Sequence, residues 1–119
     1  MTARRRVVVV DDHEPFRALV RELLQSAGYE VVGEAGDGEQ AVGACTRLRP
    51  DVVLLDVQLP GMDGFAVADR LAALDGPPVV VLISNRDVRA YRRRLLASPV
   101  RGFIHKPELS AAALAAMLD

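Results

Sequence analysis

Residues 52–64 read VVLLDVQLPGMDG, and this stretch decides the fold. Four branched aliphatic residues in a row, 52–55, predict a strand that is buried on both faces, as in a parallel sheet covered by helices. The run ends directly in Asp56, and a Pro-Gly-x-Asp-Gly turn follows it. A carboxylate there lies at the edge of the core, where burial of its charge is costly. Asp56 is therefore a helix cap, a turn-forming residue or a residue with a chemical function, and the other strand ends of the chain distinguish these roles.

Other aliphatic runs alternate with segments of helical spacing. Strands that alternate with helices are joined by right-handed crossovers into a parallel sheet. The predicted fold class is α/β: one doubly wound, flavodoxin-like domain with a five-stranded parallel sheet in order 2-1-3-4-5, flanked by five helices. We expect strands at residues 7–10, 31–32, 52–55, 79–83 and 102–104, and helices with apolar faces within residues 16–27, 41–48, 67–74, 88–95 and 111–118.

Composition limits the class of protein. The 119 residues suffice for one domain, 1–119, and the net charge of −1 gives no overall field that favours nucleic acid or an anionic membrane. The lone cysteine, Cys45, excludes an internal disulfide and fits a reducing compartment. No apolar run approaches the length of a membrane span. We therefore expect a cytoplasmic domain that contacts no membrane.

Polar side chains follow four of the predicted strands, at the edge of an open α/β sheet where ligands bind. Asp11 and Asp12 follow the first strand, Asp56 the third and Ser84 the fourth, and the fifth leads to Lys106. In the predicted order, the first and third strands are neighbours, so we expect the three carboxylates to converge. Lys106 is the only lysine beside 14 arginines, which indicates a position that needs a compact ammonium.

Three converging carboxylates repel one another unless a cation lies between them. Mg²⁺ fits this site, because it binds one or two carboxylates, keeps several waters and accompanies phosphoryl groups. Asp56 could then act as a nucleophile, while Lys106 and the Ser84 hydroxyl neutralise charge on a phosphoryl group in transfer. Together the five side chains predict a phosphoryl-acceptor site.

Several other motifs have simpler explanations. Asp63 and Asp37 are expected to cap helices, and a helix-opening turn explains residues 36–38 better than a phosphate loop. His13 and His105 are expected at the rim of the site, since neither has a second ligand at zinc spacing. The lone thiol of Cys45 is expected in the core.

The chain resembles the receiver domain of bacterial two-component response regulators over essentially its whole length. The matching segments are the acidic pair in VVVVDDHEPFR, the acceptor segment VVLLDVQLPGMDG, the hydroxyl in VVVLISNRD, and GFIHKP. By this resemblance, Asp56 is the phosphoacceptor and binds Mg²⁺ with Asp12. Asp11 helps through water, and the backbone carbonyl of Gln58 also contributes.

The resemblance also implies a conformational switch. In receivers the hydroxyl that corresponds to Ser84 moves toward the new phosphoryl group, and an aromatic residue, here Phe103, turns inward. This aromatic residue is often tyrosine in the family, and phenylalanine lacks the hydroxyl. The resemblance further predicts a cis peptide bond between Lys106 and Pro107.

These implications make the chain a phosphorelay signalling module. A sensor histidine kinase or a phosphotransfer protein would supply the phosphoryl group from a phosphohistidine, and the domain would be a switch with no metabolic activity. A downstream partner on the face of the fourth helix, fifth strand and fifth helix, and a homodimer formed on phosphorylation, are further expectations. The arginines in residues 86–94 are expected to form a solvated face without direct nucleic-acid binding, since they lack interleaved aromatic residues.

Two alternatives remain open at the level of sequence. A phosphatase of the haloacid dehalogenase type would need D-x-D-x-T after the first strand, whereas residues 11–15 read DDHEP. A degenerate receiver that binds a partner without phosphorylation would not need the intact set of site residues. The output is equally open, since GEAGDGEQA resembles receivers that carry a helix-turn-helix domain.

Overall fold

The computed structural model describes residues 4–119. Within them the strands are β1 (Arg6–Val10), β2 (Glu30–Ala35), β3 (Val52–Asp56), β4 (Val79–Ser84) and β5 (Gly102–His105). The helices are α1 (Glu14–Ser26), α2 (Gly38–Leu48), α3 (Gly64–Ala72), α4 (Arg92–Ala97) and α5 (Ala111–Leu118). Two 3₁₀ turns, η1 (Val88–Tyr91) and η2 (Lys106–Glu108), precede α4 and follow β5.

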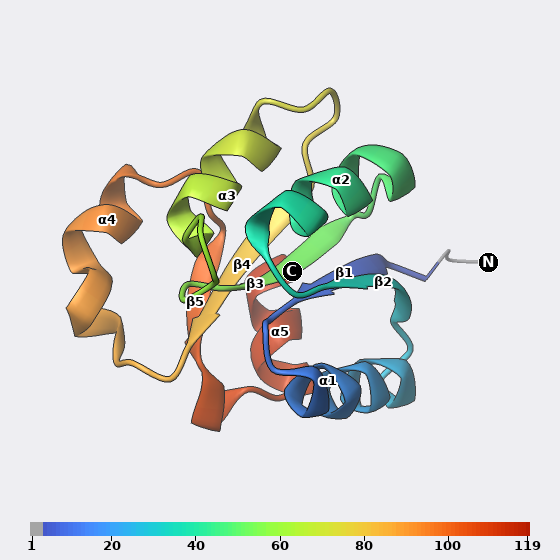
Figure 1. The fold of residues 1–119 in the computed structure, drawn as a ribbon. Coiled ribbons are helices and arrows are strands. Elements are labelled where there is room, and N and C mark those ends of the chain that lie inside the picture. The colour runs from blue at the N-terminus through green and yellow to red at the C-terminus, as the bar shows by residue number, and fades with distance from the viewer. Residues whose placement is uncertain (1–3) are drawn as a thin grey trace.

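The five strands form one parallel sheet in the order β2-β1-β3-β4-β5, which confirms the predicted fold class and strand order. Figure 1 shows the sheet passing through the middle of the molecule, with helices on both sides. The reversal of strand order lies between β1 and β3, so that the carboxyl ends of these neighbours open a crevice at one edge.

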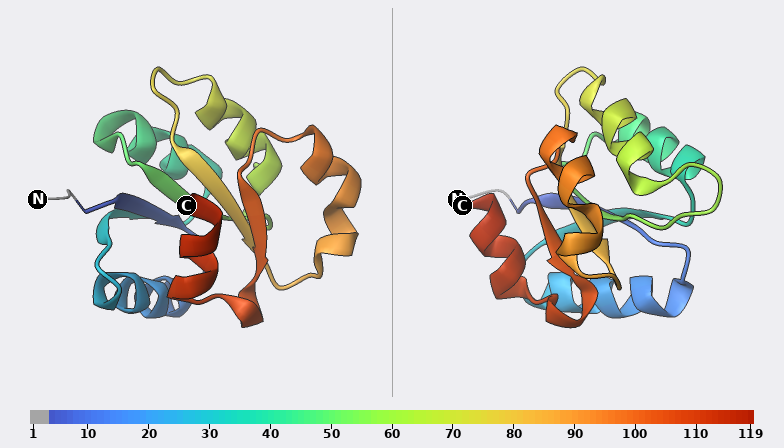
Figure 2. Two further views of the ribbon diagram at one scale, coloured as in Figure 1. Left: turned by 180° about the vertical axis from the view of Figure 1, so that it is seen from behind. Right: turned by 90° about the vertical axis from the view of Figure 1, so that its left-hand side faces the viewer.

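Helices cover both faces of the sheet, which explains why the central strands are aliphatic without alternation. Helices α1 and α5 lie on one face, and α2 and α3 on the other (Figures 1 and 2). Successive residues of a strand point to opposite faces. Thus Leu54 packs into the core beneath α1 and α5, while Leu55 packs beneath α2 and α3. Both side chains are fully buried.

Side-chain caps begin three of the helices as their sequences indicate. The carboxylates of Asp37 and Asp63 accept hydrogen bonds from backbone N–H groups in the first turns of α2 and α3, and the Ser110 hydroxyl does the same for α5. Each contact satisfies a backbone donor that the helix itself leaves free. The predicted roles of Asp37 and Asp63 as helix caps are confirmed.

Two elements differ in extent from the prediction. Strand β2 continues to Ala35 because Glu34 pairs with Val9 of β1 despite the polar sequence. The predicted fourth helix begins as the 3₁₀ turn η1, where the Asp87 carboxylate accepts a hydrogen bond from the N–H of Arg89. None of the helices in residues 4–119 combines the length and hydropathy required to cross a membrane.

Candidate functional site

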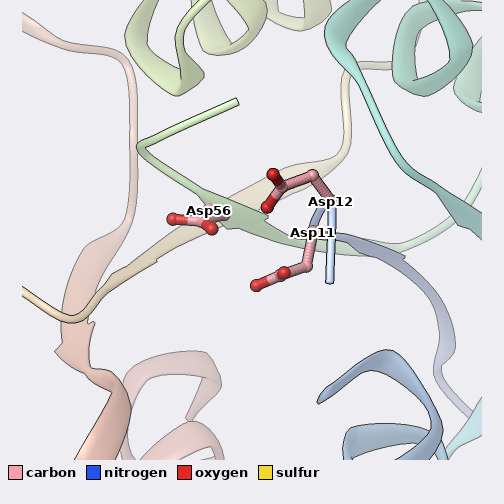
Figure 3. Close-up of side chains that lie close together, drawn as sticks. All are labelled: Asp11, Asp12 and Asp56. Atoms are coloured by element: carbon pink, nitrogen blue, oxygen red, sulfur yellow. The ribbon is translucent and has the colours of Figure 1, made fainter. Parts of the chain in front are cut away.

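The ends of β1 and β3 bring three carboxylates together. Leu55 lies opposite Val10, so Asp11 and Asp56 follow at the same edge of the sheet. Figure 3 shows Asp11, Asp12 and Asp56 gathered there. One oxygen from each of the three lies within 4.8 Å of the others. Asp11 is fully buried and Asp56 is 5% exposed, whereas Asp12 is exposed to solvent. The predicted convergence of the carboxylates is therefore present.

The lone lysine completes this cluster from the first position of η2, directly after β5. Lys106 Nζ lies 2.6 Å from Asp11 Oδ2 and 3.0 Å from Asp56 Oδ2, so one ammonium donates hydrogen bonds to both buried carboxylates. The same nitrogen lies 4.5 Å from the centre of the Phe16 ring, a cation–π contact from α1. Phe16, which the sequence marked only as an apolar helix residue, thus contributes to the site.

Burial and charge shift the pKa values of this pair. Burial raises the pKa of Asp56 to about 6, although the hydrogen bonds from Lys106 and from the Gln58 N–H oppose the shift. Burial alone would lower the pKa of Lys106, but its hydrogen bonds with Asp11 and Asp56 outweigh burial and raise it. Near neutral pH the site therefore holds the Lys106 ammonium beside the Asp56 carboxylate, whose ionised form is destabilised by burial.

A cavity of about 380 Å³ opens over the cluster. The cavity is large enough for a small anionic group and an ion beside the carboxylates, and most of its lining residues are polar. His13 lines it, as predicted. His105, which was also expected at the rim, does not line it; its Nε2 lies 2.8 Å from the Asn85 carbonyl oxygen. The cavity is lined by Asp11, Asp12, His13, Phe16, Asp56, Gln58, Asn85 and Lys106.

The turn after β3 fixes the Asp56 carboxylate. The Gln58 N–H donates a hydrogen bond to Asp56 Oδ1 at 3.1 Å, and the Gly64 N–H donates one to the Val57 carbonyl at 2.8 Å. A Cβ on Gly64 would lie 2.4 Å from the Asp56 carbonyl oxygen, so no larger residue fits without displacing the strand end. The Gly at the end of the PGMDG segment therefore allows α3 to begin directly against Asp56.

Ser84 is fully buried at the end of β4, but its hydroxyl contacts other groups than the carboxylates. Ser84 Oγ accepts a hydrogen bond from the Arg86 N–H at 3.0 Å and lies 3.2 Å from Tyr91 Oη. The ring of Phe103, which is partly buried, lies 5.9 Å from that of Tyr91. The sequence marked Tyr91 only as an apolar residue of the fourth helix, because nothing in its spacing reveals the contact with Ser84.

The predicted cis bond between Lys106 and Pro107 is wrong, because residues 4–119 contain no cis peptide bond. Pro107 lies in the 3₁₀ turn η2, where the Leu109 N–H donates a hydrogen bond to the Lys106 carbonyl. Proline is tolerated in the first turn of a helix, and the trans form is the more stable for X-Pro bonds. With the trans bond, Lys106 already reaches both carboxylates.

The model of the response regulator receiver domain family matches residues 7–119. The chain belongs to this family. Receiver domains are the signalling modules of two-component systems, and the predicted family and fold are confirmed. The match also decides against the haloacid dehalogenase alternative.

Similar proteins agree with this assignment. PdtaR of Mycobacterium tuberculosis, a transcriptional regulatory protein, is 42% identical over 86 residues, which are 71% of this chain and 42% of PdtaR. NarL of the same species, a probable transcriptional regulatory protein, is 42% identical over 96% of this chain and 53% of its own length. The chain thus spans about half the length of these two curated relatives.

Solved receiver structures share the fold closely. The signal receiver domain of M. tuberculosis NarL has a TM-score of 0.84 at 39% identity, with 98% of both chains covered. A chain of the CheX–CheY–BeF₃–Mg²⁺ complex from Borrelia burgdorferi has a TM-score of 0.84 at 27% identity, with 96% of this chain and 86% of that chain covered.

Proposed function

We propose that this domain accepts a phosphoryl group on Asp56 and thereby switches the conformation of residues near β4 and β5. The observation that carries the proposal is the position of Lys106 Nζ, within hydrogen-bonding distance of both Asp11 and Asp56 beside a polar cavity. The domain would act as a switch that assists its own phosphorylation, with no metabolic substrate.

In the proposed transfer, an Asp56 carboxylate oxygen attacks phosphorus. The P–O bond forms as the P–N bond of the donor phosphohistidine breaks, and the imidazole leaves with the electron pair. Lys106 is placed to donate hydrogen bonds to the transferred group and to offset its charge. The pKa of Asp56, about 6, leaves most of its carboxylate ionised near neutral pH.

The donor set fits Mg²⁺. Asp11, Asp12 and Asp56 supply carboxylate oxygens, which hard divalent cations prefer. Asp12 and Asp56 would bind the ion directly, Asp11 through water, and Gln58 through its backbone carbonyl. When bound, the ion would neutralise the carboxylates and the phosphoryl oxygens. The similar structure from B. burgdorferi is a complex with BeF₃ and Mg²⁺, which supports this assignment.

Ser84 and Phe103 would carry the conformational response. The Ser84 hydroxyl would move from its present contacts toward the phosphoryl group, and the partly buried Phe103 ring would turn into the space left behind. Their positions on the neighbouring strands β4 and β5 support the coupling.

The proposed donor is a sensor histidine kinase or a phosphotransfer protein. The face of α4, β5 and α5 is the proposed site for a downstream partner or for a homodimer formed on phosphorylation. Leu96 in α4 is 85% exposed and Val88 in η1 is 47% exposed, so α4 and the turn before it offer apolar side chains to a partner. Because the curated relatives are longer and regulate transcription, a DNA-binding parent protein is part of the proposal.

The test is phosphorylation by acetyl phosphate in the presence of Mg²⁺, followed by intact mass. The wild-type domain should gain one phosphoryl group, and Asp56→Asn should gain none. Asp69→Asn is the matched control, because Asp69 is an exposed aspartate of α3 that lies outside the acidic cavity. Equal labelling of wild type and Asp56→Asn would overturn the proposal, and an absence of labelling in both would favour a degenerate receiver.

A further inference from the structure

The hydroxyl of Ser84 has limited hydrogen-bonding capacity. It carries one proton and can accept two hydrogen bonds. The Arg86 N–H takes one acceptor position at 3.0 Å, and Tyr91 Oη lies 3.2 Å away. Ser84 is fully buried, so water does not replace either contact. If Ser84 donates its proton to Tyr91, the same proton is not available to a phosphoryl group.

Tyr91 is held firmly at this contact. It is 6% exposed, and its ring lies between Phe65 of α3 at 5.7 Å and Phe103 of β5 at 5.9 Å, tilted by 54° and 50°. Tilted aromatic pairs at these distances are stabilising. The packing directs the hydroxyl at Ser84, and a buried phenol needs such a partner. Among the described residues, Ser84 is the side chain that satisfies it.

We propose that Tyr91 is a positioning residue that holds the Ser84 hydroxyl in the unphosphorylated domain and competes with the phosphoryl group for it. This inference rests on the proposed phosphorylation of Asp56. When the Ser84 hydroxyl moves to the phosphoryl oxygen, it leaves Tyr91 Oη, so the hydrogen bond between the two hydroxyls breaks whichever of them donates it. Tyr91 then lacks a partner in a buried site, so its ring leaves the position between Phe65 and Phe103.

The consequence reaches α4, because Tyr91 is the residue directly before this helix. Helix α4 has six residues, none of them fully buried, and depends on few contacts with the rest of the fold. One of these is Arg94, which pairs with Asp63 and lies 4.2 Å above the Phe65 ring. Tyr91 and Arg94 thus both contact the Phe65 ring, and release of Tyr91 removes one of these two contacts.

The experiment uses Tyr91→Phe, which deletes the hydroxyl and keeps the ring. Beryllofluoride with Mg²⁺ serves as the phosphoryl mimic, and binding is followed by the NMR shifts of backbone amides next to Asp56. We expect Tyr91→Phe to bind about fivefold more tightly than wild type, since a competing hydrogen bond of about 1 kcal/mol is lost. In a Ser84→Ala background, the same substitution should have no effect.

A second readout observes Tyr91 directly. The chain has no tryptophan and two tyrosines, so Tyr29→Phe leaves Tyr91 as the only tyrosine fluorophore. Tyr29→Phe is also the matched control for loss of a phenol, and it should bind beryllofluoride as wild type does. In this variant, the emission of Tyr91 should change as beryllofluoride binds, and the concentration at half of this change should equal the midpoint of the NMR titration.

The outcomes separate the two proposals. If the wild type responds to beryllofluoride while Tyr91→Phe binds within twofold of it and the Tyr91 emission stays constant, the role of Tyr91 is overturned and the phosphorylation of Asp56 stands. If the wild type itself shows no response to beryllofluoride with Mg²⁺ and no labelling by acetyl phosphate, both proposals fail.

Discussion

At the scale of single residues, the site depends on one ammonium between two buried carboxylates. Lys106 donates to Asp11 and Asp56 and also lies over the Phe16 ring. An ammonium directs its three protons at separate acceptors from a compact centre, whereas a guanidinium is a broad planar fork. The rarity of lysine in this arginine-rich chain indicated such a position correctly. The contact with Phe16 depends on side-chain packing between β5 and α1, which sequence spacing does not encode.

The raised pKa of Asp56 predicts how stability depends on pH when no divalent cation is present. Between its usual value of 3.8 and its value of about 6, the folded protein keeps a proton on Asp56 that the unfolded chain has released. The contribution of Asp56 to the stability of the wild type should therefore fall as pH rises through this window. Asp56→Asn lacks this titration, so it should be more stable than wild type at pH 7, with a difference that shrinks toward pH 4.

Urea denaturation at several pH values with a chelator present measures this difference. Addition of Mg²⁺ at pH 7 should reverse the order, since the ion stabilises the ionised carboxylates of the wild type. A difference between the two proteins that is constant from pH 4 to pH 7 would contradict the raised pKa.

At the scale of elements, the sequence predicted the central strands best, because a short uninterrupted run of branched aliphatic residues is typical of a strand that is buried on both faces. The bounds of β2 and α4 were less predictable. Pairing with β1 extends β2 through the polar Glu34, which Arg17 and Arg21 neutralise. The first turn of the predicted fourth helix is tightened into η1 by the Asp87 cap. In both cases, contacts distant in sequence or local hydrogen bonds outweighed the apolar spacing.

Alanine should have opposite effects at two glycines, Gly64 at the contact between α3 and the end of β3, and Gly43 in α2. In Gly64→Ala, the Cβ would lie 2.4 Å from the Asp56 carbonyl oxygen and 2.8 Å from Val57 Cα. We expect a loss of about 1–3 kcal/mol in the free energy of unfolding, as in other overpacked sites, and slower phosphorylation because Asp56 is displaced. Gly43→Ala in α2 is the control, since its Cβ meets no heavy atom within 4 Å outside its own helix.

Gly43→Ala should instead stabilise the domain by about 0.5–1 kcal/mol, because alanine favours the helix over glycine. Urea denaturation and the rate of labelling by acetyl phosphate measure both variants. Normal labelling and unchanged stability of Gly64→Ala would show that the strand end is more adaptable than its packing indicates.

At the scale of the whole molecule, topology explains why residues far apart in sequence meet. Asp11, Asp56 and Lys106 are separated by tens of residues, yet parallel strands place their carboxyl ends at one edge of the sheet. The strand order therefore sufficed to predict the carboxylate cluster. It did not predict the orientation of the Ser84 hydroxyl or the trans bond at Pro107, because both depend on local backbone and side-chain geometry.

The core beneath α2 offers a measure of the stability of the whole fold. Cys45 is 2% exposed, and burial raises the pKa of its thiol from 9.0 to about 11, so the folded protein holds it as a neutral thiol at pH 8. Only the thiolate reacts with disulfide reagents, so a buried neutral thiol reacts slowly while the protein stays folded. We expect labelling at pH 8 to be at least ~10³-fold slower than in urea-unfolded protein, as marginal but cooperative stability implies.

Beryllofluoride with Mg²⁺ should slow the labelling of Cys45 further in the wild type and leave Asp56→Asn unchanged, because a ligand that binds only the folded state suppresses its opening. Labelling near the unfolded rate would show that α2 detaches on its own. An identical effect of the ligand on Asp56→Asn would mean that the ion acts elsewhere than on the acceptor carboxylate.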